Sequence, residues 1–417
     1  MTLLQIASLL IVLAAVFGTI NYFFLRLPSA IGILVVALFA SLTVLVSDAI
    51  IPSLTVAETI RAEVLDIEFS DALLEGMLGF LLFAGALHVK LENLKAEWVP
   101  VVLMATIGIA LSTAIVGFGF SWITGMPLLV ALVFGALISP TDPVAVLGVL
   151  RQAELQKSLE TKIAGESLFN DGVGYVVFLI LVGLAFPSAG HHAEGDVVTG
   201  AALLFLQEAF GGALLGLVLG WLTFRVMRRI DDYALEVLIT LALAFGGYEL
   251  AVALHVSAPI MAVCAGLLIG EVGTKYGMSE TTRRYVDHFW TLIDEVLNAV
   301  LFLMIGFEVF AIAFDRSFLI AGGLAILLHL VGRFSAVFVP VMLLRPFRSF
   351  SDGVVRIMTW GGLKGGISVA LALSLPDSEW KPVILTATYV VVVFSIIVQG
   401  LTVAKLATRV GREPELY

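Results

Sequence analysis

Residues 165–172, with the sequence Gly-Glu-Ser-Leu-Phe-Asn-Asp-Gly, combine two carboxylates, an amide and a hydroxyl that could together hold a proton or a hard cation. They belong to an apolar stretch, residues 163–186, that is long enough to cross a bilayer. A carboxylate at such a depth is costly and therefore indicates a functional site. On a helix, Ser167, Asn170 and Asp171 fall on one stripe and face one partner. A helix N-cap is the alternative, but Asp171 lies about ten residues beyond the preceding loop lysines, too deep for a cap.

Two further stretches combine a charge with residues that interrupt a helix. Residues 139–143, Ser-Pro-Thr-Asp-Pro, hold two prolines, which remove backbone donors and leave carbonyl groups free within the membrane. Residues 361–366, Gly-Gly-Leu-Lys-Gly-Gly, surround Lys364 with four glycines, which weaken a helix. A simple kink or close helix packing would explain either break alone. The charges, Asp142 at one break and Lys364 at the other, favour a binding site.

Five charged residues of the apolar segments converge on one depth. At ~1.5 Å per helical residue, Asp142 and Asp171 lie roughly 5 and 4 Å to the cytoplasmic side of the segment centres. Arg333 and Lys364 fall within about 3 Å of the midplane, and Glu166 lies one to two turns from Asp171. A long basic side chain at this depth cannot easily reach water, so we expect it to be paired.

The composition requires a membrane protein around these residues. Of the 417 residues, 60% are hydrophobic and 13% charged, and the mean hydropathy is +1.07, which excludes an ordinary soluble domain. The single cysteine, Cys264, excludes an internal disulfide. The first apolar stretch, residues 3–25, is too long for a signal-peptide core and is predicted to be a retained helix.

Thirteen apolar segments are predicted to be transmembrane helices. They are residues 3–25, 29–51, 72–89, 98–124, 127–150, 161–186, 198–225, 233–254, 257–272, 286–314, 318–344, 353–375 and 382–407. With the N-terminus outside, 17 of the 23 basic residues fall in the inner loops and tail, three in outer loops and three within spans. The outer loop at 52–71 is acidic instead. This distribution predicts an external N-terminus and a cytoplasmic C-terminus.

The order of the segments predicts an internal symmetry within one transmembrane domain, residues 1–417. The first six segments, residues 1–186, map onto the last six, residues 233–407, with the seventh, residues 198–225, as a linker helix. The two repeats run in opposite directions, and a broken helix stands at an equivalent place in each. Inverted repeats with crossing broken helices are typical of secondary transporters.

The motifs resemble those of bacterial sodium/proton antiporters of the cation/proton antiporter-1 group, the NhaP type, over essentially the whole chain. The matching stretches are residues 141–143, 166–172, 329–333 and 361–366, the last followed by Ala-Leu-Ala-Leu-Ser-Leu-Pro at 370–376. The chain departs from the family pattern at Ala84, where relatives often have a carboxylate. It also departs at Lys364, where many have arginine, because lysine lacks the planar fork of a guanidinium.

The resemblance implies a role for each residue of the motifs. Asp171 would be the shared proton and cation site, and Asp142, Ser167 and Thr141 would complete the coordination of Na⁺. Asn170 would belong to the same site. The sequence Asn-Asp at 170–171 resembles the electroneutral branch of the family, rather than the Asp-Asp of the electrogenic branch. Glu166 and Arg333 would form a structural ion pair. Lys364 would be the charge at the second broken helix.

The predicted activity is the exchange of a monovalent cation for H⁺ by alternating access, one for one, in pH and sodium homeostasis. The cation would be Na⁺, with Li⁺ or K⁺ as alternatives. We expect no enzymatic activity, no cofactor and no nucleic-acid partner. The protein would lie in the inner (plasma) membrane, and the resemblance implies a homodimer. Glu249, Glu308 and His88 lie in or near spans and receive no role from the sequence.

Three other functions are alternatives to this one. A channel would need no switch between loaded states and no coupling to protons. A symporter of an organic anion would require a cavity poor in acids, whereas three carboxylates belong to this site. An intramembrane aspartyl protease also holds two aspartates, but these must share a proton at close range and follow a Gly-x-Gly-Asp sequence, which surrounds neither Asp142 nor Asp171.

Overall fold

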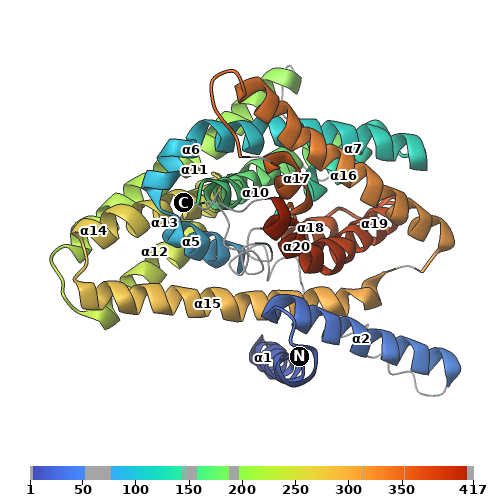
Figure 1. The fold of residues 1–417 in the computed structure, drawn as a ribbon, viewed down its shortest axis with the longest axis horizontal. Coiled ribbons are helices and arrows are strands. Elements are labelled where there is room, and N and C mark those ends of the chain that lie inside the picture. Colours follow the sequence, from blue (N-terminus) through green and yellow to red (C-terminus); the bar gives the residue numbers. More distant parts are fainter. Residues whose placement is uncertain are drawn as a thin grey trace.

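The structure, a computed structural model, describes residues 3–51, 77–142, 146, 157–186, 197–312, 314–351 and 353–410. Every regular element within these ranges is a helix (Figure 1), which confirms the predicted all-α class. Pro143 and the predicted acidic loop at 52–71 lie outside the described residues, as do parts of the predicted segments 72–89 and 127–150.

The helices of the first part of the chain follow the predicted order. They are α1 (Leu3–Ile20) continued by η1 (Asn21–Leu25), α2 (Ser29–Ile50), α5 (Leu78–His88), α6 (Leu91–Leu103) continued by η3 (Met104–Gly108) and α7 (Ile109–Thr124), α8 (Leu128–Ile138), α10 (Lys157–Ala185) and α11 (Val197–Met227).

The later helices also match predicted segments, with one segment divided in two. They are α12 (Tyr233–Ala253), α13 (Ala258–Leu268) continued by η6 (Ile269–Gly273) and α14 (Thr274–Tyr276), α15 (Glu280–Phe307) followed by η7 (Glu308–Ala311), α16 (Arg316–Leu344), α17 (Val354–Trp360), α18 (Gly366–Leu373), and α19 (Lys381–Phe394) continued by η8 (Ser395–Gln399) and α20 (Gly400–Val410).

Within the described ranges, nine helices are long and apolar enough to cross a membrane, and α5 and α8 are shorter apolar helices. The chain is therefore a multi-pass membrane protein. Three helices begin four or more residues earlier than predicted, α6 at Leu91 rather than 98, α10 at Lys157 rather than 161 and α15 at Glu280 rather than 286. Their first turns contain charged residues, so hydropathy alone placed the beginning of each segment too late. The start of α15 is fixed by Ser279, whose hydroxyl accepts a hydrogen bond from the Thr282 amide at 3.3 Å.

Most helices pack in two groups, each around its own apolar core, and a smaller third core lies among α1, α2 and α15. One core lies among α5, α11, α12, α13 and the first half of α15 and includes Phe83 and Trp290. The other lies among α7, α8 and α16–α20 and also takes in residues of α2, α10 and the end of α15. Small residues allow the close contacts that membrane helices use. A Cβ on Gly135 of α8 would lie 2.3 Å from the Thr113 carbonyl of α7, and one on Gly266 of α13 would lie 2.7 Å from the Phe83 carbonyl of α5.

The helix α15 extends along one side of the molecule, with α1 and α2 packed beside it (Figure 1). It contacts α5 and α12 of the first group and α18 of the second. A Cβ on Gly366, the first residue of α18, would lie 2.1 Å from the Leu301 side chain of α15. The beginning of α18 is thus set directly against α15, and this is where the candidate site lies.

Candidate ion-binding site

The two predicted helix breaks are present and contact each other. The helix α8 ends at Ile138. The predicted segment 353–375 is interrupted between Trp360, the end of α17, and Gly366, the start of α18. The backbone amide of Asp142 donates to the Leu363 carbonyl at 2.8 Å, which joins one break to the other. The two non-helical stretches therefore cross each other at this hydrogen bond.

Lys364 binds the carbonyl groups that the first break sets free. Its Nζ donates to the Ser139 carbonyl at 2.6 Å and to the Pro140 carbonyl at 2.8 Å. The side chain is fully buried. The end of α8 carries the negative pole of the helix dipole, so an ammonium group there compensates both that pole and the unpaired carbonyls. The prediction that this break leaves carbonyl groups without helical partners is confirmed, and these carbonyls accept hydrogen bonds from a lysine of the other broken segment.

The side chain of Asp142 lies against the opposite pole. It approaches Gly365, which precedes the first residue of α18, so closely that an added Cβ would lie 2.3 Å from Oδ2. The beginning of a helix carries the positive pole, which favours a carboxylate. Each break therefore presents its charge to a helix end of opposite polarity, the arrangement expected where half-helices meet at a transport site.

We expect Gly365→Ala to disturb this contact. The added methyl group must displace the Asp142 carboxylate or the α18 backbone, and overpacking of this kind typically costs ~1–3 kcal/mol. The variant should melt at a lower temperature in detergent and should lose most of its ion exchange in proteoliposomes. Gly323→Ala on α16 is the matched control, because no heavy atom lies within 4 Å of its added Cβ. Equal behaviour of the two variants would contradict the assignment.

Three polar residues connect the first break to α10. The Asn170 carboxamide accepts from the Thr141 amide at 3.3 Å and donates to the Thr141 hydroxyl at 2.8 Å. That hydroxyl shares a further hydrogen bond of 2.9 Å with the Ser167 hydroxyl. All three side chains are buried. Asn170 thus uses both ends of its amide to position Thr141, and the hydroxyls of Thr141 and Ser167 lie side by side between the first break and α10.

Asp171 lies directly beside this network and is only 4% exposed. The Asp142 carboxylate repels its negative charge, and Lys364 attracts it. Two glycines let α10 approach its neighbours here, because added Cβ atoms would lie 2.6 Å from Ile260 at Gly172 and 2.4 Å from Pro140 at Gly174. A buried carboxylate next to a second one can bind a proton or a cation, since either removes the repulsion.

The Glu166 carboxylate and the Arg333 guanidinium form a bidentate ion pair. Nη1 of Arg333 contacts Oε1 of Glu166, and Nη2 donates to Oε2 at 2.8 Å. Arg333 also donates to the Met358 carbonyl in α17, from Nε at 3.1 Å and from Nη2 at 3.0 Å. Glu166 is 1% and Arg333 4% exposed. The pair therefore ties α10 to α16 and, through the carbonyl, to the last turn before the second break.

Two residues at the second break have no counterpart in the sequence analysis. The Ser395 hydroxyl accepts from the Lys364 amide at 2.9 Å, and the Gln399 side chain donates to the Trp360 carbonyl at 3.0 Å. Both are fully buried and belong to η8. The spacing of four residues between two polar side chains in an otherwise apolar segment places them on one helix face, and this pattern could have revealed them.

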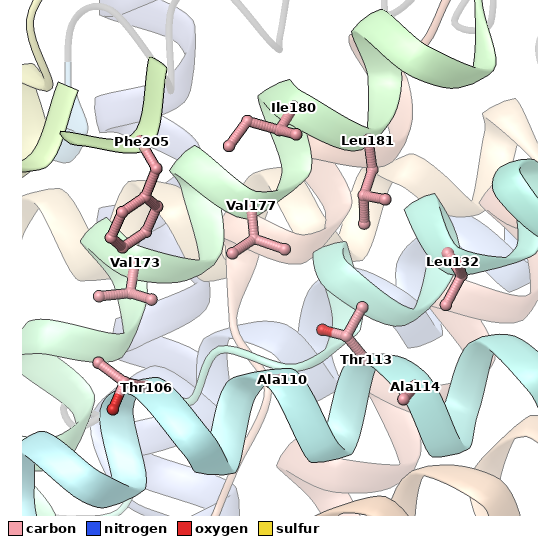
Figure 2. Close-up of a pocket in the computed structure, with 10 residues that line it drawn as sticks. All are labelled: Thr106, Ala110, Thr113, Ala114, Leu132, Val173, Val177, Ile180, Leu181 and Phe205. Carbon is pink, nitrogen blue, oxygen red and sulfur yellow. The ribbon is translucent and has the colours of Figure 1, made fainter. Parts of the chain in front are cut away.

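A cavity of about 430 Å³ lies next to the site, between α7, α8, α10 and α11 (Figure 2). Its lining is aliphatic and aromatic apart from the hydroxyls of Thr106 and Thr113, and Val173 and Val177 of α10 point into it. The Thr106 hydroxyl already donates to the Val102 carbonyl at 2.6 Å, and the Thr113 hydroxyl lies 3.4 Å from that of Ser139. The cavity offers no ligand set for a cation, so the oxygen atoms at the crossing remain the candidate site.

Comparison with known proteins agrees with this arrangement. The family model described as sodium/hydrogen exchanger, transmembrane, matches residues 7–409. The Na⁺/H⁺ antiporter NhaP of Pseudomonas aeruginosa is 45% identical over 427 residues, which cover 98% of this chain and 97% of that protein. The Na⁺/H⁺ antiporter NhaH of Halobacillus dabanensis is 36% identical over 392 residues, 93% of each chain.

A solved structure shows the same fold at lower sequence identity. The sodium proton antiporter MjNhaP1 from Methanocaldococcus jannaschii, determined at pH 8, superposes with a TM-score of 0.75 at 20% identity and covers 97% of both chains. The matched family model spans both helix breaks and the whole of α10. The crossing of the two breaks, the buried carboxylates beside it and the extent of these matches lead to one conclusion: the chain belongs to the sodium/hydrogen exchanger family of membrane proteins.

Proposed function

We propose that the protein is a secondary antiporter that exchanges Na⁺, or a similar monovalent cation, for H⁺ across the inner membrane. The observation that carries the proposal is the buried Asp171 carboxylate, placed beside Asp142 where the two helix breaks cross. The names of the relatives NhaP and NhaH support the choice of ions.

The proposed cation site consists of oxygen atoms only. Asp171 and Asp142 supply carboxylates, and Thr141 and Ser167 supply neutral oxygens; oxygen ligands of this kind suit a hard cation. Asn170 contributes by holding Thr141 in place. A bound Na⁺ and a proton on Asp171 exclude each other because both neutralise the same charge. Na⁺ and H⁺ are the substrates, and the proposal requires no cofactor.

Alternating access follows from the predicted symmetry. Residues 1–186 and 233–407 are proposed to be inverted repeats joined by residues 198–225, with the N-terminus outside and the C-terminus in the cytoplasm. The two broken segments would then open the site to one side at a time as the repeats move. Assembly as a homodimer belongs to the same proposal.

The charges of the site favour one-for-one exchange. The ionised site has a net charge of −1, because three carboxylates face two basic groups; these residues are Asp142, Asp171, Glu166, Arg333 and Lys364. One Na⁺ or one proton brings the site to neutrality. Two protons would leave a buried positive charge, which the membrane interior disfavours. Each half-cycle should therefore carry one ion.

We expect exchange in proteoliposomes to be electroneutral. With the membrane potential clamped, a change of potential alone should drive no net Na⁺ movement. Net flux should reverse where the inside-to-outside concentration ratio of Na⁺ equals that of H⁺. Uphill Na⁺ movement driven by the potential, or a reversal point that fits two protons per cation, would contradict the charge count.

The experiment that tests the function itself is the change of internal pH that follows a Na⁺ gradient in proteoliposomes. An antiporter moves protons in the direction opposite to the Na⁺ flux, whereas a cation channel dissipates the Na⁺ gradient without proton coupling. Replacing Na⁺ by Li⁺ or K⁺ in the same assay identifies the preferred cation. Peptide cleavage by the detergent-solubilised protein would instead indicate the protease.

A further inference from the structure

Two buried polar side chains between η7 and α19 have no assigned role. Glu308 of η7 is 3% exposed and Tyr389 of α19 is 5% exposed. Within the described ranges, neither Oε2 of Glu308 nor the Tyr389 hydroxyl has a hydrogen-bond partner. Buried polar atoms without partners are rare because they lose their hydration without compensation. A carboxylate and a phenol in this condition therefore require a functional explanation.

The two side chains belong to one apolar core, which includes Tyr389 and the residues that directly follow Glu308, namely Val309 and Phe310. The charge of Glu308 acts on the Tyr389 hydroxyl. The turn η7 continues α15 and contacts α2, and α19 packs on α16 and α18. Two further buried hydroxyls in these helices, those of Ser41 in α2 and Thr388 in α19, also lack partners within the described residues.

The helix α19 links this place to the ion site. Its continuation η8 holds Ser395, which binds the Lys364 amide at 2.9 Å. Tyr389 precedes Ser395 by six residues, which corresponds to about 9 Å along a helix. The positive-inside distribution places the start of α19 and the end of α15 on the external face, so Tyr389 and Glu308 lie on the external side of the crossing.

We propose that Glu308 and Tyr389 form an intermediate binding site for the exchanged ions, on the route between the Asp171 site and the external face. This inference deepens the proposed function and rests on it. The Glu308 carboxylate can attract a cation or accept a proton, and the Tyr389 hydroxyl can donate to that carboxylate or serve as a further oxygen ligand. Val309, Phe310 and Ile312, which follow Glu308 in the chain, are buried in the same core, and in this proposal they close the route when no ion passes.

Cysteine labelling tests the route without any measurement of transport. The chain has one cysteine, so Cys264→Ser gives a cysteine-free background. We expect Glu308→Cys and Tyr389→Cys in this background to react with an impermeant cationic methanethiosulfonate added outside sealed, right-side-out vesicles. Their rates should exceed that of Ala325→Cys, a fully buried α16 position, by at least ~tenfold, because thiol reactivity requires access. Rates equal to that control, or reaction only from the cytoplasmic side, would overturn the proposal.

Sided kinetics test the role of the intact side chains. Glu308→Gln and Tyr389→Phe should raise the KM for Na⁺ presented outside by at least ~fivefold and leave the KM for Na⁺ presented inside within about twofold. Glu249→Gln is the matched control, because Glu249 is exposed on α12. An equal change on both sides, or a lower melting temperature with unchanged KM values, would mean that Glu308 only supports packing.

The two measurements separate this inference from the proposed function. If the wild-type protein exchanges no cation for protons, the proposed function fails, yet labelling still shows whether an external route reaches Glu308. If exchange is present and labelling is absent, only the proposal of an intermediate binding site at Glu308 and Tyr389 is overturned.

Discussion

Asp171→Asn is expected to abolish cation/proton exchange while leaving a folded, membrane-inserted protein. The amide has nearly the shape of the carboxylate but neither takes up a proton nor carries the charge that binds Na⁺. The neighbouring hydrogen bonds among Thr141, Asn170 and Ser167 do not involve the Asp171 side chain, so the network should persist. The measurement is Na⁺-driven proton movement in proteoliposomes, which should fall to the level of empty liposomes.

The control for Asp171→Asn is Asp377→Asn. The Asp377 side chain is fully exposed, and among the described residues its one ion pair is with Lys381, one turn away at 3.1 Å, so its replacement should leave exchange unchanged. Size-exclusion profiles and melting temperatures of both variants would verify folding. Clear Na⁺-dependent proton movement by Asp171→Asn would remove Asp171 from the centre of the mechanism.

The helix breaks could be predicted from the sequence because their causes are local. Proline removes a backbone donor and glycine weakens a helix wherever it stands. The partner of the freed carbonyls could not be predicted in the same way. Lys364 and Ser139 are separated by 225 residues, and nothing in either stretch specifies that the lysine reaches these carbonyls rather than a carboxylate. That choice depends on how the two broken segments cross.

The role of Asn170 shows a different limit. Its amide type and its place on the stripe with Asp171 and Ser167 indicate a ligand as well as a positioning group. Only the geometry shows that its oxygen and its nitrogen are both used by Thr141. Side-chain type predicts what a group can bind, whereas the partners it already has decide what remains available.

Glu308 was visible in the sequence only as an acid near the end of a span. Hydropathy suggests a solvated helix end at such a position, but the following turn η7 folds inward and buries the side chain to 3% exposure. The turn contacts α2, which lies near the beginning of the chain. Contacts between segments so far apart in sequence are set by helix packing, so local pattern does not reveal them.

Glu166 and Arg333 are expected to stabilise the fold more than any other pair of charges at the site. Removing one partner of a buried ion pair leaves an uncompensated charge and typically costs about 3–5 kcal/mol. Glu166→Gln and Arg333→Ala should each lower the melting temperature in detergent by more than Asp171→Asn does. Arg333→Ala should have the larger effect, because it also leaves the Met358 carbonyl without its donor.

A double-mutant cycle separates the pair from the individual losses. The double variant should lose less stability than the two single losses combined, because neither charge is then left alone in the membrane. The same cycle on Glu280 and Arg284, an exposed pair one turn apart on α15, should give a coupling near zero, since surface ion pairs contribute little. If the losses for Glu166 and Arg333 are simply additive, the two residues act independently, and another contact must hold α10 to α16 beside the ion site.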